Sequence, residues 1–277
     1  MHAWTISQFM HGEQGALVAT AKICAGSRSI GDKYYGDKYY AAQQVADEAR
    51  HVEVYQRYLE QIDMEYPIGS FLRSLLHDVT GRDEIDMTYP GMQILIEGVA
   101  LAAFSLGGAV FANPLIAQIT ELVRRDEARH VAFGVLSLQG FSDEMDPVDL
   151  RVREEFLLES CAAIRDRFVP IDVFARMGSD VEQATKEFAV SPDAMLFRNL
   201  IFSKVVPNLR KLGLLTPRVR QGFETLGILQ YASYVDSATE AGELDAADAI
   251  DEDDLIGRFR ASLAGVEKIE PEPVLRS

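Results

Sequence analysis

The chain contains the same six-residue word twice, Asp-Glu-Ala-Arg-His-Val, at residues 47–52 and 126–131. Each copy places a Glu three residues before a His, which gives the pairs Glu48 with His51 and Glu127 with His130. On a helix this spacing brings both side chains onto one face, one turn apart. A carboxylate and an imidazole that face the same point are typical of half of a metal site. One such pair arises easily by chance, but two identical six-residue copies do not, so the repeat predicts two half-sites.

Two further carboxylates stand alone in apolar surroundings. Glu13 is the only acidic residue among residues 1–31, and Glu97 is the only formally charged side chain between Met87 and Thr120. A buried carboxylate either has a raised pKa or needs a cation to hold it ionised. Two divalent ions would balance four carboxylates and leave two imidazoles neutral. The sequence therefore predicts a dinuclear metal site with the ligands Glu13, Glu48, His51, Glu97, Glu127 and His130.

The residues beside each Glu-x-x-His predict a second layer of contacts. A metal-bound imidazole usually donates its other N–H to a carboxylate that fixes the ring. If the two helices are antiparallel neighbours, Asp47 and Asp126 can each reach the His of the other copy, and Arg50 and Arg129 can pair with these carboxylates. The alternative is a solvated charged helix face that happens to repeat. That alternative does not explain the isolated glutamates.

Helical periodicity and breakers predict an all-α chain without β-strands. The metal helices are expected at residues 4–27, 39–63, 91–110 and 114–139, with Asn113 and Pro114 starting the last of them. A short helix is expected near Phe71, inside an irregular stretch punctuated by Pro90. Residues 1–235 are expected to form one domain, in which later helices cover the metal helices or form a subunit contact; these helices are expected at 147–177, 181–189, 193–212 and 217–226. An acidic tail that is flexible or loosely docked is expected at 236–277.

Composition limits the classes of function. The net charge is -16, with 12 acidic and 4 basic residues in 236–277 and 31 acidic against 23 basic residues before them. An acidic surface argues against nucleic acid or an anionic membrane as partner. The segment 92–112 is apolar enough for a membrane span, but it lacks basic and aromatic flanks, so a buried helix is the preferred interpretation. Cys24 and Cys161 show no disulfide pattern and the N-terminus shows no secretory signal, so we expect a cytoplasmic protein.

The order Glu, Glu-x-x-His, Glu, Glu-x-x-His resembles that of the ferritin-like di-iron carboxylate superfamily, in its oxygen-activating branch. This branch includes the ribonucleotide reductase small subunit, bacterial multicomponent monooxygenases and arylamine N-oxygenases. The resemblance covers residues 1–140. It implies a ferritin-like four-helix bundle with additional C-terminal helices. It also implies two iron ions, or a manganese and iron pair, with O2 as co-substrate.

The corresponding function is an oxygenase or oxidase that acts on a small organic substrate and receives electrons from a separate donor, and we expect a homodimer. Small or apolar residues one turn from the ligands would leave room for the substrate, or would only allow close helix packing. These residues are Ala16, Ala100, Leu101 and Gly134.

Two other functions remain open on the sequence. Tyr55 follows the first His by four residues, the position of the radical-bearing Tyr in the ribonucleotide reductase small subunit, so Tyr55 is either a radical carrier or an aromatic packed beside the site. Leu101 stands where that subunit usually has Phe, which speaks against it. Val123 stands where the arylamine N-oxygenases carry a third metal His. A ferroxidase or iron-storage protein would use the same metal site without an organic substrate.

Overall fold

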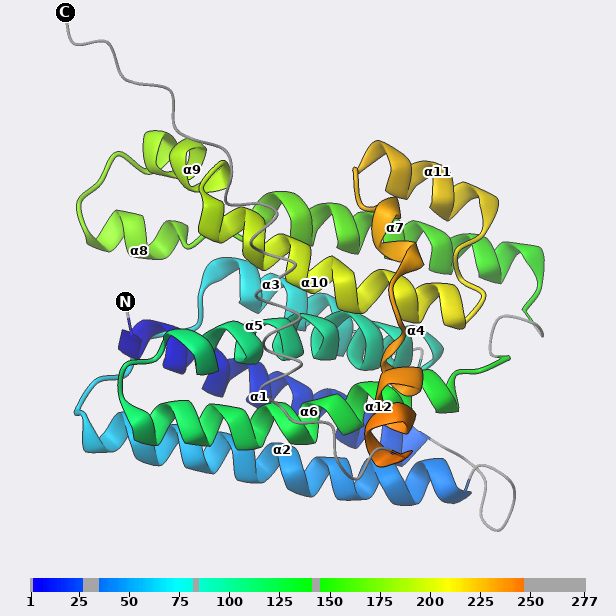
Figure 1. Cartoon of the computed structure of the whole chain (residues 1–277), viewed down its shortest axis with the longest axis horizontal. Coiled ribbons are helices and arrows are strands. Elements are labelled where there is room, and N and C mark those ends of the chain that lie inside the picture. The colour runs from blue at the N-terminus through cyan, green and yellow to red at the C-terminus, as the bar shows by residue number, and fades with distance from the viewer. Residues whose placement is uncertain (1, 27–34, 82–84, 141–144, 247–277) are drawn as a thin grey trace, which may run out of the picture. The chain divides into compact units, whose positions relative to one another are not determined.

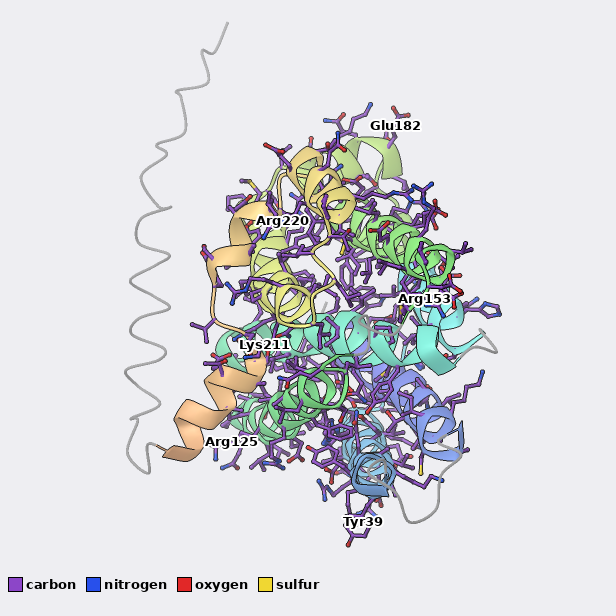
Figure 2. The ribbon with its side chains drawn as sticks, turned by 90° about the vertical axis from the view of Figure 1, so that its right-hand side faces the viewer. Tyr39, Arg125, Arg153, Glu182, Lys211 and Arg220 are labelled. Atoms are coloured by element: carbon purple, nitrogen blue, oxygen red, sulfur yellow. The ribbon has the colours of Figure 1, made fainter. Side chains whose placement is uncertain are left out.

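The computed structural model describes residues 2–26, 35–81, 85–140 and 145–246, and within these ranges every regular element is a helix (Figure 1). The all-α prediction is therefore confirmed. Polar side chains such as Arg125, Glu182 and Arg220 project from the outside of the helices (Figure 2). The apolar side chains form the interior.

Four helices lie side by side and carry the candidate ligands (Figure 1). They are α1 (His2–Gly26), α2 (Tyr35–Gln61), α5 (Glu97–Val110) and α6 (Pro114–Ser137). Buried residues recur every three or four positions along α1, and Glu13 belongs to this stripe, together with Ile6, Met10, Ala16 and Ile23. α6 begins as predicted, because the Asn113 side chain accepts a hydrogen bond from the N–H of Leu115 at 2.9 Å and Pro114 takes the first position. α2 and α6 run in opposite directions (Figure 1).

The helix that brings Glu97 to the site begins earlier than predicted. α4 (Ile85–Pro90), a π-helix η1 (Gly91–Ile96) and α5 follow one another without a break, after the separate helix α3 (Ser70–Thr80). Pro90 therefore lies inside a helical segment, not in an irregular stretch. Proline has no N–H for the usual bond to the carbonyl four residues earlier, and the chain continues with wider turns, in which the Glu97 N–H bonds to Met92 O. All six residues of η1 are buried.

The later helices form a second layer. They are α7 (Pro147–Arg167), α8 (Ile171–Arg176), α9 (Val181–Ala189), α10 (Pro192–Lys211) and α11 (Pro217–Thr225), followed by the short 3-10 helix η2 (Leu229–Ser233). The single helix predicted for 147–177 is wrong, because the chain breaks at Phe168–Pro170 between α7 and α8. α10 packs on α5 and η1. This close packing is possible because residue 98 is a glycine. A Cβ at this position would stand only 2.8 Å from Val205 Cγ2.

The chain divides into two compact units at Thr239 and Glu240, close to the expected start of the tail. The first residues of that tail have defined contacts. Asp236 and Ser237 are buried, Asp236 Oδ1 accepts the N–H of Thr239 at 3.0 Å, and α12 (Ser237–Ala246) follows. The prediction of flexibility for 247–277 falls outside the described residues.

One helical stretch, Thr88–Gly107, is long and apolar enough to cross a membrane by length and composition. Within the 18 most apolar consecutive residues of this stretch, 78% are buried inside the protein. α10, α6 and α1 surround it with protein contacts. The stretch therefore has the properties of the core helix of a soluble protein, as the sequence predicted.

Candidate metal centre

The structure brings all six predicted ligand side chains together in the interior. They form two overlapping groups, and within each group one ligand atom per residue lies within 4.8 Å of the others. The first group contains Glu13 and His51, the second contains Glu97 and His130, and both contain Glu48 and Glu127. All six side chains are buried. Two carboxylates are thus shared between two four-residue groups, an arrangement that suits two neighbouring cations.

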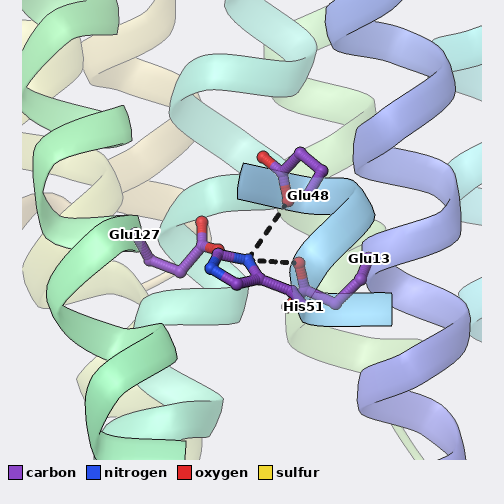
Figure 3. A group of neighbouring side chains, drawn as sticks. All are labelled: Glu13, Glu48, His51 and Glu127. Carbon is purple, nitrogen blue, oxygen red and sulfur yellow. Dashed lines mark hydrogen bonds and ion pairs between the residues drawn. The ribbon is translucent and has the colours of Figure 1, made fainter. Parts of the chain in front are cut away.

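The antiparallel α2 and α6 make this arrangement nearly symmetric. Each helix contributes one shared Glu and, one turn later, the His that belongs to one group. His51 Nδ1 lies 3.2 Å from Glu13 Oε2, 3.6 Å from Glu48 Oε2 and 3.1 Å from Glu127 Oε1 (Figure 3). His130 Nδ1 lies 3.3 Å from Glu48 Oε1 and 3.2 Å from Glu127 Oε2. In both rings it is therefore Nδ1 that faces the carboxylates of the site.

The other ring nitrogen, Nε2, faces an Asp carboxylate of the other copy of the repeat. His51 Nε2 lies 3.1 Å from Asp126 Oδ2, and His130 Nε2 lies 3.4 Å from Asp47 Oδ2. Each Asp thus reaches the His of the other copy, as the sequence predicted. Such a contact fixes the orientation of the ring and the nitrogen that carries the proton.

The two arginines of the repeat complete this layer. Arg50 pairs with Asp47 at 2.8 Å and with Asp126 at 3.0 Å, and Arg129 pairs with Asp126. Both predicted pairings are therefore present. The guanidinium groups are exposed, so their contribution to stability is small. Their effect is to hold the two Asp carboxylates where the imidazoles need them.

Burial and mutual repulsion favour the protonated form of two of the four glutamates in the metal-free protein. Burial first, and then the charge of Glu127, raises the pKa of the Glu13 carboxyl well above its ordinary value. Burial and the charges of Glu127 and Glu48 do the same to the pKa of Glu97. Without a cation, the neutral form of both carboxyl groups is therefore favoured.

The shared glutamates and the histidines carry opposite charges. Burial alone would lower the pKa of His51, but hydrogen bonds to Glu127 and Glu13 outweigh it and raise this pKa far above that of a free imidazole. The pKa of His130 is also raised well above its ordinary value, against burial, mainly by the charge of Glu127 and by Asp47. Burial opposes ionisation of Glu48 and Glu127 too, yet the two imidazoles hold their pKa values below the ordinary range. In the metal-free protein, the protons on the two imidazoles therefore balance the negative charges of the two shared carboxylates, a role that bound cations would otherwise have.

Two buried glutamines extend the site, and neither was predicted from the sequence. Gln44 Nε2 donates to Glu97 Oε1 at 2.7 Å and to Glu48 Oε1 at 3.1 Å, and Gln44 Oε1 accepts from Gln93 Nε2 at 2.9 Å. Both side chains are fully buried. A signal was present, because each glutamine stands four residues before a ligand glutamate, on the same helix face.

Tyr55 lies next to the first group. Its side chain is fully buried, its ring packs against Phe9 and Phe104 with centroids 5.8 and 6.1 Å away, and burial together with the charge of Glu13 raises its pKa well above 10. The hydroxyl lies beside that of Thr120, but among the described residues neither makes a well-formed hydrogen bond. Tyr55 is thus both an aromatic packed beside the site and a phenol within reach of its charges.

A cavity of about 520 Å³ leads to the ligands. Glu13, Glu97 and Glu127 lie at its inner end, and most of its wall is apolar. Ala16 and Ala100 line it, as expected of residues that leave room for a substrate. Gly134 has the other role considered above, because a Cβ there would stand 2.4 Å from Gln93 Cβ. Leu101 is buried and is not part of the cavity wall.

The donor set fits two divalent cations of the first transition row. Carboxylate oxygens and imidazole nitrogens are the ligands that iron and manganese take in proteins. Glu48 Oε2 and Glu127 Oε1 are both buried and both face His51 Nδ1, at 3.6 and 3.1 Å, so a single N–H cannot satisfy both oxygens, whereas a cation could.

Neither a family model nor a curated protein sequence matches this chain. The resemblance to the di-iron carboxylate proteins therefore rests on the residues and on the geometry described above.

Proposed function

We propose that this chain is a ferritin-like di-iron protein, in which α1, α2, α5 and α6 form the metal-binding bundle, and that it catalyses the O2-dependent oxidation of a small organic substrate. The two overlapping groups of ligands support two ions, shared through Glu48 and Glu127. A manganese and iron pair is compatible with the same donors. A separate electron donor would return the metals to the reduced state.

When bound, two reduced iron ions would supply the electrons for O2 reduction, which no side chain can supply. The side chains of this protein would hold and insulate these ions. Nδ1 of each imidazole and the four carboxylates form the binding surface, while Asp47 and Asp126 fix the rings from behind. The ligand side chains are buried within the bundle, and burial strengthens the charge interactions at the site.

The cavity favours oxidation of an organic substrate over iron handling. A ferroxidase or storage site needs a path for ions, which polar and charged groups would line. Here the path that reaches Glu13, Glu97 and Glu127 is mostly apolar, and its volume is in the range of small-molecule sites. This observation carries the proposal.

Metal stoichiometry tests the site itself. The protein should bind two Fe(II) ions per chain without O2, and Glu97→Ala or His130→Ala should reduce this to one or none. Glu53→Ala is the matched control, because Glu53 is an exposed glutamate of α2 and should leave two ions bound. Unchanged stoichiometry in both site variants would refute the assignment. The organic substrate is then sought as the compound that accelerates O2 consumption by the reduced protein.

A second candidate function is favoured by one observation, the complete burial of Tyr55 beside Glu13. In that case Tyr55 would carry a stable radical for a partner protein. Exposure of the iron-loaded protein to O2 would then give a tyrosyl signal in electron paramagnetic resonance. If Tyr55→Phe retained this signal, Tyr55 would not be the carrier.

A further inference from the structure

The wall of the cavity contains buried and exposed acidic residues. The candidate ligands Glu13, Glu97 and Glu127 are buried, whereas Asp193 at the start of α10 is exposed and Asp172 and Trp4 are half-buried; we call this more exposed part of the wall the mouth. Asp172 Oδ2 and Trp4 Cζ2 both flank Gly69, at 3.6 and 3.7 Å from the place of a Cβ on that residue. Between Trp4 and Glu13 the helix α1 rises about 13 Å. A ligand that fills the cavity is therefore elongated.

Most of the cavity wall offers no polar partner to such a ligand. Phe71, Phe168 and Phe197 form a row of edge-to-face rings with successive centroids 5.1 Å apart. Val99, Ala103 and other apolar residues of α5 contribute to the wall as well. This section fits an aliphatic or aromatic chain.

The charges of the wall have one sign. Among the described side chains that line the cavity there is no Lys or Arg, whereas Asp172 and Asp193 stand at the mouth. Asp172 Oδ2 accepts hydrogen bonds from Ser70 N at 2.8 Å and Ser70 Oγ at 3.1 Å. In the described part of the chain, neither Asp forms an ion pair with a cationic side chain. The mouth therefore repels an anion and attracts a cation.

We propose that the substrate is an elongated apolar amine, which binds with its ammonium group at the mouth beside Asp172 and Asp193 and with its apolar chain toward Glu13 and Glu97. This rests on the proposed function and narrows it to one substrate class. An apolar carboxylic acid of the same length meets two carboxylates and no counter-ion at the mouth. The shape of the cavity admits both the amine and the acid, so the negative charge of the mouth selects the amine.

The single Trp of the chain makes the binding measurable without turnover. Trp4 lines the mouth, so a ligand that enters should change its fluorescence. In titrations of the full-length protein at neutral pH, decylamine should bind about tenfold more tightly than decanoate, with decanol in between, as expected for charge interactions near a surface. The double variant Asp172→Asn and Asp193→Asn should abolish this difference and leave the affinity for decanol unchanged. Asparagine keeps an acceptor oxygen for Ser70, so α3 should remain in place.

Two results would overturn the proposal. One is decanoate binding as tightly as decylamine. The other is an amine preference that persists in the double variant, because the ammonium group would then lie at the inner glutamates. Ala103→Phe locates the ligand: it should weaken all three compounds alike, and unchanged affinities would show that they bind outside the cavity. These experiments measure binding alone. The preference for an amine can therefore be confirmed even if the reduced protein does not consume O2, which would refute the proposed function separately.

Discussion

Loading the protein with two divalent ions should release four protons near pH 7. The four come from Glu13, Glu97, His51 and His130, because each of these groups has a raised pKa in the metal-free protein and must lose its proton to become a ligand. Glu48 and the other shared glutamate, Glu127, have lowered pKa values and release none. Metal-free and metal-loaded sites are then both electrically balanced.

The direction of the pH dependence follows from these shifts. Since protons compete with the metal, binding weakens as the pH falls and strengthens as it rises. With four protons released, the overall constant for binding two ions rises about 10⁴-fold per pH unit, as long as the pH stays below the raised pKa values. Calorimetric titration with Mn(II) in buffers of different ionisation enthalpy gives the proton count directly. A pH-stat titration provides an independent count.

Glu97→Gln sharpens the measurement, because glutamine has no proton to lose. About three protons should then be released per two ions, if both still bind, and Glu53→Gln on the exposed face of α2 should keep the count at four. Release of fewer than about two protons from the native protein would mean that the histidines are already neutral, or Glu13 and Glu97 already ionised, before the metal binds. The balance of protons and carboxylates described above would then be wrong.

Three further results are expected. Gln44→Leu should leave the fold intact and weaken metal binding about 10- to 100-fold in chelator competition, since the glutamine orients two ligands. Gly134→Ala should destabilise the protein by about 1–3 kcal/mol in urea unfolding through overpacking, whereas Gly12→Ala, with no atom within 4 Å of the added Cβ, should not. A thiol reagent should label the half-buried Cys24 in the native protein and Cys161 only after unfolding, because Cys161 is fully buried and burial raises its pKa to about 12. Labelling of both thiols in the native state would contradict this.

The ligands could be predicted because helical spacing is a local property. Glu48 and His51 share a helix face whatever the rest of the chain does, and the same holds for the second copy. The isolated Glu13 and Glu97 were visible because a charge is rare on an apolar stripe. The crossed contacts of Asp47 and Asp126 needed one further assumption, that the two copies face each other in opposite directions. The structure places them in that way.

Features that depend on packing against distant segments of the same chain could not be predicted in the same way. Pro90 and Pro170 look alike in the sequence, yet the helix continues through Pro90 with π-type turns and ends before Pro170. Tertiary packing decides this, because η1 is buried on all sides and the chain at Pro170 is not. The cavity joins residues from α1, α3, α5 and α10, which no local pattern connects.

The repeated word makes the two ligand groups look equivalent, but their surroundings differ. Gln44 stands three residues before the first copy, and the same position before the second copy is Val123. The group with Glu97 and His130 therefore has an amide that donates to two of its carboxylates, while the group with Glu13 has Tyr55 beside it. An amide donor withdraws electron density from a carboxylate and fixes its direction, so the two ions should differ in affinity. Gln44→Leu should accordingly weaken one ion more than the other, and equal weakening of both would show that the two positions act as one.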